Sequence, residues 1–225
     1  MRPYLADIVT ELHKQWPDNR AIQVVCHGHS VPAGYFATPV VDTFNAYPHL
    51  LHRGLKERFP FAVVNVIVTA KGGETSTLGA ERFAREVLCH RPDVVTLDYG
   101  LNDRAMGLAA AQAAWRAMIE QALALPSKVL LLTPTPDASA FGAGPAEDWA
   151  AIQQHTEQIR AMASEYQVGL VDSLKAFTRY QQAGGDLTDL LSWSNHPNRA
   201  GHALVATELL RFFPVAFADN PAPGK

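Results

Sequence analysis

The chain has 225 residues, of which 48% are hydrophobic and 18% are charged, and its formal net charge is −3. A chain of this length can bury a substantial core, so we expect a single domain over residues 1–225. Its lysines and arginines form no cluster, which argues against nucleic acid as a partner, and no apolar run is long enough to cross a membrane. Segment 1–16 lacks the apolar core of a signal peptide, which predicts a cytoplasmic location.

Short apolar segments rich in β-branched residues alternate along the chain with longer segments of helical periodicity. In chain order they predict a helix over 4–16, a strand over 22–26, a helix over 44–58, a strand over 62–68, a helix over 80–88, a strand over 94–97, a helix over 108–122, a strand over 128–132, a helix over 146–165, a strand over 168–171 and a helix over 199–213. Strands that alternate with helices form parallel sheets covered on both faces. The order therefore predicts an α/β fold, a three-layer αβα sandwich of flavodoxin-like type with about five parallel strands; a Rossmann-like strand order is the alternative.

Polar motifs directly follow the first three predicted strands, at 27–30, 71–75 and 98–103. The carboxyl ends of parallel strands meet at one edge of a sheet, and ligands bind there in open α/β folds. We therefore expect these motifs to form one site. Segment 134–145, rich in Pro, Ala and Gly, follows the fourth strand and predicts a loop in the wall of the same pocket.

Each candidate residue has a simpler explanation when it is considered alone. Ser30 and Asn102 are typical helix caps, Gly73 is typical of a turn, and His196 precedes a Pro that could start a helix. Together, however, they supply a nucleophile, a base and donors for a developing oxyanion, which are the parts that acyl transfer needs.

In their order and spacing these motifs resemble those of the SGNH (GDSL-like) hydrolases, a family of serine esterases and lipases. The matching residues are Ser30 in a Gly-His-Ser turn, Gly73, Asn102 in Gly-Leu-Asn-Asp, and His196 in Asn-His-Pro-Asn. The resemblance spans nearly the whole chain. It implies that Ser30 is the nucleophile and His196 the general base, and that the Ser30 and Gly73 N–H groups and the Asn102 amide form the oxyanion hole. It implies no metal and no cofactor.

Two positions depart from the family pattern. His29 replaces the Asp that precedes the nucleophile, and Trp193 stands where the family has an Asp three residues before the catalytic His. We favour a Ser–His dyad in which a backbone carbonyl near Ser192 or Trp193 holds the imidazole. The alternative is a substitute carboxylate, for which the candidates are Asp189, Glu74 and Asp103. His29, Tyr35 and Trp193 are candidates for the substrate pocket.

Two other enzyme classes fit less well. The His-x-His pattern of His27 and His29 is also typical of metallohydrolases, but a metal site leaves Asn102 and His196 without a role. An α/β-hydrolase would need Gly-x-Ser-x-Gly, and Pro32 occupies the last of those positions.

We therefore expect a serine ester hydrolase that acts through an acyl-enzyme on short-chain esters. Its substrates would be small-molecule or saccharide esters, with acetyl esters of sugars or simple alcohols foremost. The alternative from another class is a catalytically impaired homologue that binds an acylated carbohydrate, and the missing acid at Trp193 is what favours it. Nothing in the sequence indicates the oligomeric state.

Overall fold

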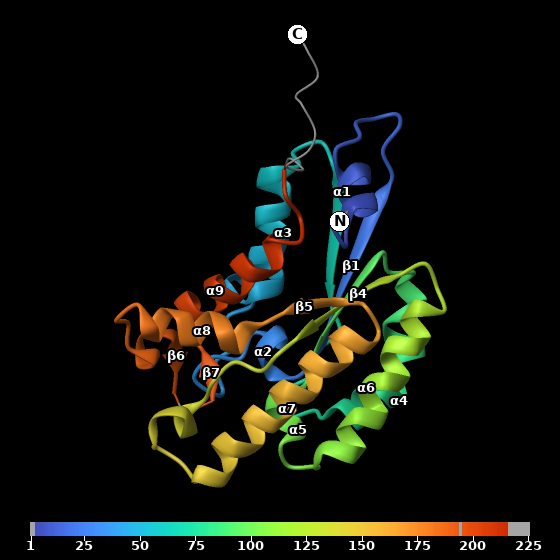
Figure 1. Ribbon diagram of the computed structural model, residues 1–225. Coiled ribbons are helices and arrows are strands. Elements are labelled where there is room, and N and C mark those ends of the chain that lie inside the picture. Colours follow the sequence, from blue (N-terminus) through green and yellow to red (C-terminus); the bar gives the residue numbers. More distant parts are fainter. Residues whose placement is uncertain (1–2, 194, 216–225) are drawn as a thin grey trace.

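A five-stranded parallel sheet forms the centre of the protein (Figure 1), whose computed structural model describes residues 3–193 and 195–215. The strands are β1 (Ala21–Gly28), β2 (Val63–Val68), β3 (Val94–Asp98), β4 (Lys128–Leu132) and β5 (Gly169–Val171), and their order in the sheet is β2-β1-β3-β4-β5. This is the flavodoxin-like order, with a switch point between β1 and β3. The predicted fold class and all five predicted strands are confirmed.

Helices cover both faces of the sheet (Figure 1). One face carries α1 (Ala6–Leu12), α3 (Tyr47–Arg58), α8 (Ser173–Gln182) and α9 (Arg199–Leu210), and the other carries α4 (Ser76–Glu86), α6 (Leu108–Leu123) and α7 (Ala146–Glu165). Side chains of successive strand residues point to opposite faces, so Val24 and Cys26 join one buried cluster and Val25 joins the other. Burial on both faces explains why the strands read as continuous apolar runs.

Several elements were not predicted from the sequence. Helix α8 is amphipathic, with Leu174 and Phe177 buried, and Asp172 caps it by accepting the Lys175 N–H. The others are too short to show periodicity: the one-turn helices α2 (Ser30–Ala33) and α5 (Gly100–Asp103), and the hairpin of β6 (Leu191–Ser192) and β7 (His196–Pro197). Within residues 3–193 and 195–215, no helix is both long and apolar enough to cross a bilayer.

Hydrogen bonds between the segments that follow β1, β2 and β3 bring the three polar motifs to one edge of the sheet. The Lys71 N–H donates to the Gly28 carbonyl (3.0 Å), and the His29 N–H donates to the Asp98 carbonyl (3.1 Å). The motifs at 27–30, 71–75 and 98–103 therefore lie side by side, as expected for the carboxyl ends of neighbouring parallel strands.

Candidate active site

Ser30 lies where β1 turns sharply into α2. A side chain at Gly28 would place its Cβ 2.4 Å from the Asp98 carbonyl oxygen, so the close approach of β1 to the end of β3 requires glycine there. Gly34, with φ of +92°, then ends α2. Ser30 is 7% exposed, so its hydroxyl group is shielded from bulk water without being sealed off.

His196 reaches Ser30 from the β6–β7 hairpin. Its Nε2 lies 2.9 Å from Ser30 Oγ, and its Nδ1 lies 2.8 Å from the Phe36 carbonyl oxygen. Because a carbonyl oxygen can only accept, Nδ1 carries the proton and Nε2 of the neutral ring is left to accept from the serine hydroxyl. Burial lowers the pKa of His196 below 6.5, and the Phe36 carbonyl partly offsets this effect. A neutral histidine next to the hydroxyl group is the form that a general base needs.

The group behind the imidazole is a backbone carbonyl, but it is not the one that we expected. We placed it near Ser192 or Trp193, whereas it belongs to Phe36, on the segment that follows α2. Trp193 itself is 77% exposed, and its φ of +61° turns the hairpin between Ser192 and His196.

The three candidate substitute carboxylates are engaged elsewhere. Asp189 accepts from the Tyr180 hydroxyl (3.3 Å), and Glu74 binds the guanidinium group of Arg82. Asp103 accepts from the Ser76 N–H (2.8 Å) and from the Trp115 indole N–H (2.7 Å). Each oxygen of Asp103 is therefore bonded to a group of the fold, and neither points to the imidazole.

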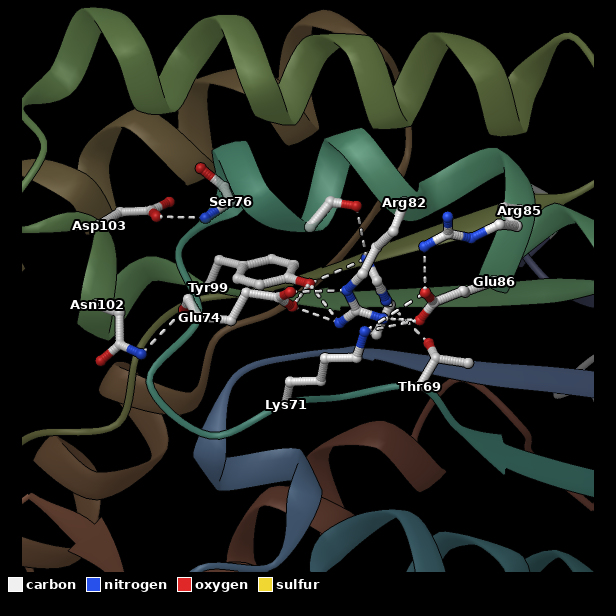
Figure 2. Close-up of polar contacts among 12 residues, drawn as sticks. Thr69, Lys71, Glu74, Ser76, Arg82, Arg85, Glu86, Tyr99, Asn102 and Asp103 are labelled. Atoms are coloured by element: carbon white, nitrogen blue, oxygen red, sulfur yellow. Dashed lines mark hydrogen bonds and ion pairs between the residues drawn. The ribbon is translucent and has the colours of Figure 1, made fainter.

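The two further oxyanion candidates lie on neighbouring segments. Gly73 sits in the loop between β2 and α4 with φ of +74°, a left-handed conformation that favours glycine. Asn102 lies in α5, and its Nδ2 donates to the Glu74 carbonyl at 2.9 Å (Figure 2). That bond uses one of the two N–H groups of the amide, so the second can serve a ligand.

Tyr35 lies between this loop and His196. A Cβ added at Gly72 would lie 3.0 Å from the Tyr35 ring, so the ring packs closely on the loop. The centroid of the same ring lies 6.0 Å from that of His196. Tyr35 is half-buried, so its ring forms part of the wall between the loop of Gly73 and His196.

His29 lies beneath Ser30 and is only 1% exposed. Its Nδ1 accepts the Val31 N–H at 3.2 Å, which caps α2, and lies 3.3 Å from Ser30 Oγ. Its Nε2 lies 3.4 Å from Asp98 Oδ1. The structure therefore places this ring between Ser30 and the buried Asp98 carboxylate, rather than in an open pocket wall.

The ring of His27 is engaged on both nitrogens. Nδ1 bonds to the Thr69 hydroxyl (2.8 Å), and Nε2 bonds to the Tyr99 hydroxyl (2.9 Å) and lies 3.2 Å from the Gly79 carbonyl. Burial lowers the pKa of His27 to about 4, so the ring is neutral. In the part of the chain that the structure describes, no three His, Cys, Asp or Glu side chains are grouped so that they could hold a metal ion.

Several known structures that superpose on this chain are esterases or acylhydrolases. An acetylxylan esterase from Geobacillus stearothermophilus superposes with a TM-score of 0.73 at 20% identity, over 90% of this chain and 97% of that one. A two-domain esterase active on acetylated mannans gives a TM-score of 0.75 at 20% identity; the match covers 99% of this chain but only 58% of that enzyme. A lipase/acylhydrolase from Enterococcus faecalis gives 0.71 at 23% identity, over 84% of this chain and 94% of that one.

These identities show a shared fold. A search of the curated proteins gave no match. The family model of the GDSL-like lipases and acylhydrolases, by contrast, matches residues 26–204, which contain every candidate catalytic residue named above. The resemblance inferred from the motifs is confirmed: the chain belongs to the GDSL-like lipase/acylhydrolase family.

Proposed function

We propose that the protein is a serine ester hydrolase that cleaves short-chain esters, acetyl esters of carbohydrates among them, through an acyl-enzyme. The observation that carries the proposal is the 2.9 Å contact of Ser30 Oγ with His196 Nε2, in a ring whose Nδ1–H is held by the Phe36 carbonyl. The nucleophile and an unprotonated base are thus already paired.

The reaction follows from this pair. Ser30 Oγ attacks the ester carbonyl carbon while His196 Nε2 takes the hydroxyl proton, and the carbonyl oxygen becomes an oxyanion. The Ser30 N–H, the Gly73 N–H and the second N–H of the Asn102 amide are the donors assigned to it. The imidazolium then returns its proton to the leaving alcohol as the C–O bond breaks, and water releases the acid from Ser30 by the same steps.

The proposed substrate class is supported by two independent observations. Enzymes of this fold that superpose on the chain are active on acetylated xylan and acetylated mannan. In addition, the indole of Trp193 is largely exposed three residues before His196, and an exposed aromatic ring offers a face on which a sugar can stack.

The test is hydrolysis of p-nitrophenyl acetate, butyrate and octanoate in EDTA by the parent protein and by Ser30→Ala. We expect the parent to favour acetate and Ser30→Ala to lose at least about 10³-fold in kcat/KM, because without the nucleophile only binding and oxyanion stabilisation remain. Ser164→Ala, which removes an exposed hydroxyl on α7, is the matched control and should retain parent activity. Release of acetate from acetylated xylan and mannan oligosaccharides then tests the carbohydrate.

Two outcomes would overturn the proposal. Turnover that EDTA abolishes would favour a metal site at His27 and His29. A parent protein that hydrolyses no ester but binds acetylated oligosaccharides would favour the catalytically impaired homologue, the second candidate, which the position of Trp193 in place of the family's carboxylate supports.

A further inference from the structure

The loop that carries Gly73 is exposed at its tip. Lys71, Gly72 and Gly73 all face solvent, and no atom lies within 4 Å of the point where a Cβ of Gly73 would be. The Lys71 N–H bond to Gly28 and the contact of Gly72 with Tyr35 hold the residues before it, but no packing contact holds Gly73 itself. An oxyanion donor is effective only if it is already oriented when the charge develops, so the orientation of the Gly73 N–H depends on how the chain continues after it.

The residue after Gly73 is anchored in the protein interior. Glu74 is 8% exposed, and its carboxylate is bound by the guanidinium of Arg82, which is 5% exposed. Arg82 Nε donates to Glu74 Oε1 at 2.7 Å, and Arg82 Nη2 donates to Oε2, so the pair is bidentate (Figure 2). Such a pair fixes the orientation of a carboxylate as well as its position.

A third donor to the same carboxylate is the hydroxyl of Tyr99, which lies 3.0 Å from Glu74 Oε2. Burial raises the pKa of Tyr99, so the hydroxyl keeps its proton and donates it. The neutral ring of His27 supports this hydroxyl from the other side through its Nε2, at 2.9 Å. The Glu74 carboxylate therefore accepts hydrogen bonds from a charged group, Arg82, and from a neutral one, Tyr99.

The backbone of the same residue holds the other oxyanion donor. The Glu74 carbonyl accepts a hydrogen bond from Asn102 Nδ2 at 2.9 Å. Figure 2 shows the two residues side by side, just before α4 begins. A second hydrogen bond joins the start of α4 to α5: the Ser76 N–H donates to Asp103 Oδ1 at 2.8 Å. Glu74 is thus in peptide linkage with one donor, Gly73, and in hydrogen-bond contact with the other, Asn102.

From this geometry we infer that Glu74, held by Arg82 and Tyr99, is a positioning residue that sets the spacing between the Gly73 N–H and the Asn102 amide before the oxyanion forms. The inference rests on the proposed function, because it assigns a role to groups around the Ser30 site. It also assigns the buried Glu74–Arg82 pair a role in catalysis, in addition to any role in stability.

The two carboxylates bound to Arg82 allow a matched pair of substitutions. Its guanidinium binds two carboxylates, Glu74 on the loop side and Glu86, at 2.8 Å from Nη1, on the outer side (Figure 2). Glu74→Gln and Glu86→Gln each remove one carboxylate from the same cation, but only Glu74 contacts an oxyanion donor. We expect Glu74→Gln to lower kcat by about 10-fold to 10²-fold with KM within about twofold, since displacing donors costs no more than the loss of one. Glu86→Gln removes a half-buried carboxylate that also pairs with Lys71 and Arg85, and it should keep kcat within about twofold because Glu86 contacts neither Gly73 nor Asn102.

Inhibition by a trifluoromethyl ketone separates positioning from general stability. Such a ketone adds to the nucleophilic serine and places an oxyanion among the same donors, so its Ki should rise in Glu74→Gln by the factor by which kcat/KM falls. A purely structural role would lower the melting temperature and leave kcat and Ki of the folded protein at parent values, and that result would overturn the inference.

If Glu74→Gln does not fold, Tyr99→Phe makes the same test without removing a charge. It deletes one of the two donors to Glu74 Oε2 and should lower kcat by roughly 3-fold to 10-fold, with a parallel rise in Ki, because the bidentate Arg82 still holds the carboxylate. Parent values of kcat and Ki in Tyr99→Phe would then overturn the inference. Failure of the inference stays distinct from failure of the proposed function: in the first case Ser30→Ala is inactive while Glu74→Gln is fully active, and in the second Ser30→Ala is active.

Discussion

The two sides of Ser30 are supported by different kinds of groups. On one side, His196 is held by a neutral backbone carbonyl, that of Phe36. On the other side, the loop that carries Gly73 is tied down by a buried ion pair between Glu74 and Arg82. A serine hydrolase usually has a charged group behind its histidine; here the charged pair lies behind the loop of Gly73, a proposed oxyanion donor.

This difference separates two tasks that a triad carboxylate performs together. A carbonyl can select the tautomer and orientation of His196 as well as a carboxylate can, because both accept from Nδ1–H. It stabilises the imidazolium less, since it carries no net charge. The geometry of the base is therefore preserved while its electrostatic support is reduced, and transition-state stabilisation should depend more strongly on the oxyanion side.

The largest effect that tests this comparison is expected for Asn102→Ala. Loss of the amide removes one proposed oxyanion donor and also its bond to Glu74, so kcat should fall by about 10²-fold to 10³-fold with little change in KM. Steady-state kinetics on p-nitrophenyl acetate measure it, and Asn65→Ala on the exposed side of β2 is the control. A change of less than twofold would mean that Asn102 does not serve the oxyanion.

Trp193→Asp tests the support of His196 by adding a carboxylate three residues before it. As the proposed general base, His196 must be neutral, and burial lowers its pKa, so the acid limb of kcat/KM should lie below pH 6.5 in the parent. A carboxylate at position 193, where the family has one, should raise this pKa and shift the limb upward by about half to one pH unit, with a several-fold higher kcat. Asp also tolerates the left-handed backbone of this position better than Trp.

The control for that variant is Trp193→Asn, which changes the shape of the side chain in the same way but adds no charge. The pH–rate profiles of the two variants should differ in their acid limbs. Identical limbs would show that a carboxylate at position 193 does not act on His196, and the carbonyl-held dyad would then be insensitive to this position.

A smaller effect concerns the stability of the histidine side. His202 stacks on Phe36, with ring centroids 4.9 Å apart, and its Nδ1 accepts the Tyr47 N–H. Burial lowers its pKa to about 3. Below pH 6.5 the unfolded chain binds a proton that the folded protein does not bind, so stability falls as the pH drops from 6.5 toward 3.

For one such histidine the loss between pH 7 and pH 5 is about 2 kcal/mol. Urea denaturation of the parent and of His202→Phe at the two pH values measures it, and the pH-dependent loss should be smaller in the variant whatever its absolute stability. An equal loss in both proteins would show that His202 is not the group responsible.

The sequence predicted the sheet well, and it placed the polar motifs at one edge of it, because both depend on short-range patterns. Apolar runs revealed the five strands, and the motifs of Ser30, Asn102 and His196 consist of residues adjacent in the chain. Helix α8 was missed, although Asp172 as a cap before Leu174 and Phe177 was a readable signal. The hairpin of β6 and β7 has too few residues to show any periodicity.

The sequence by itself determined the family, the fold class and the candidate catalytic residues of the chain, whereas the structure chose the flavodoxin-like strand order over the Rossmann-like one. Only the tertiary structure decided what supports those residues. The group that holds His196 lies 160 positions away in the sequence, and it is a backbone carbonyl, which every residue type has and which therefore leaves no signal in the sequence. The partner of Glu74 could not be predicted either, because the sequence does not show whether a glutamate orients an imidazole or binds an arginine. Glu74 binds Arg82 because α4 packs against the loop.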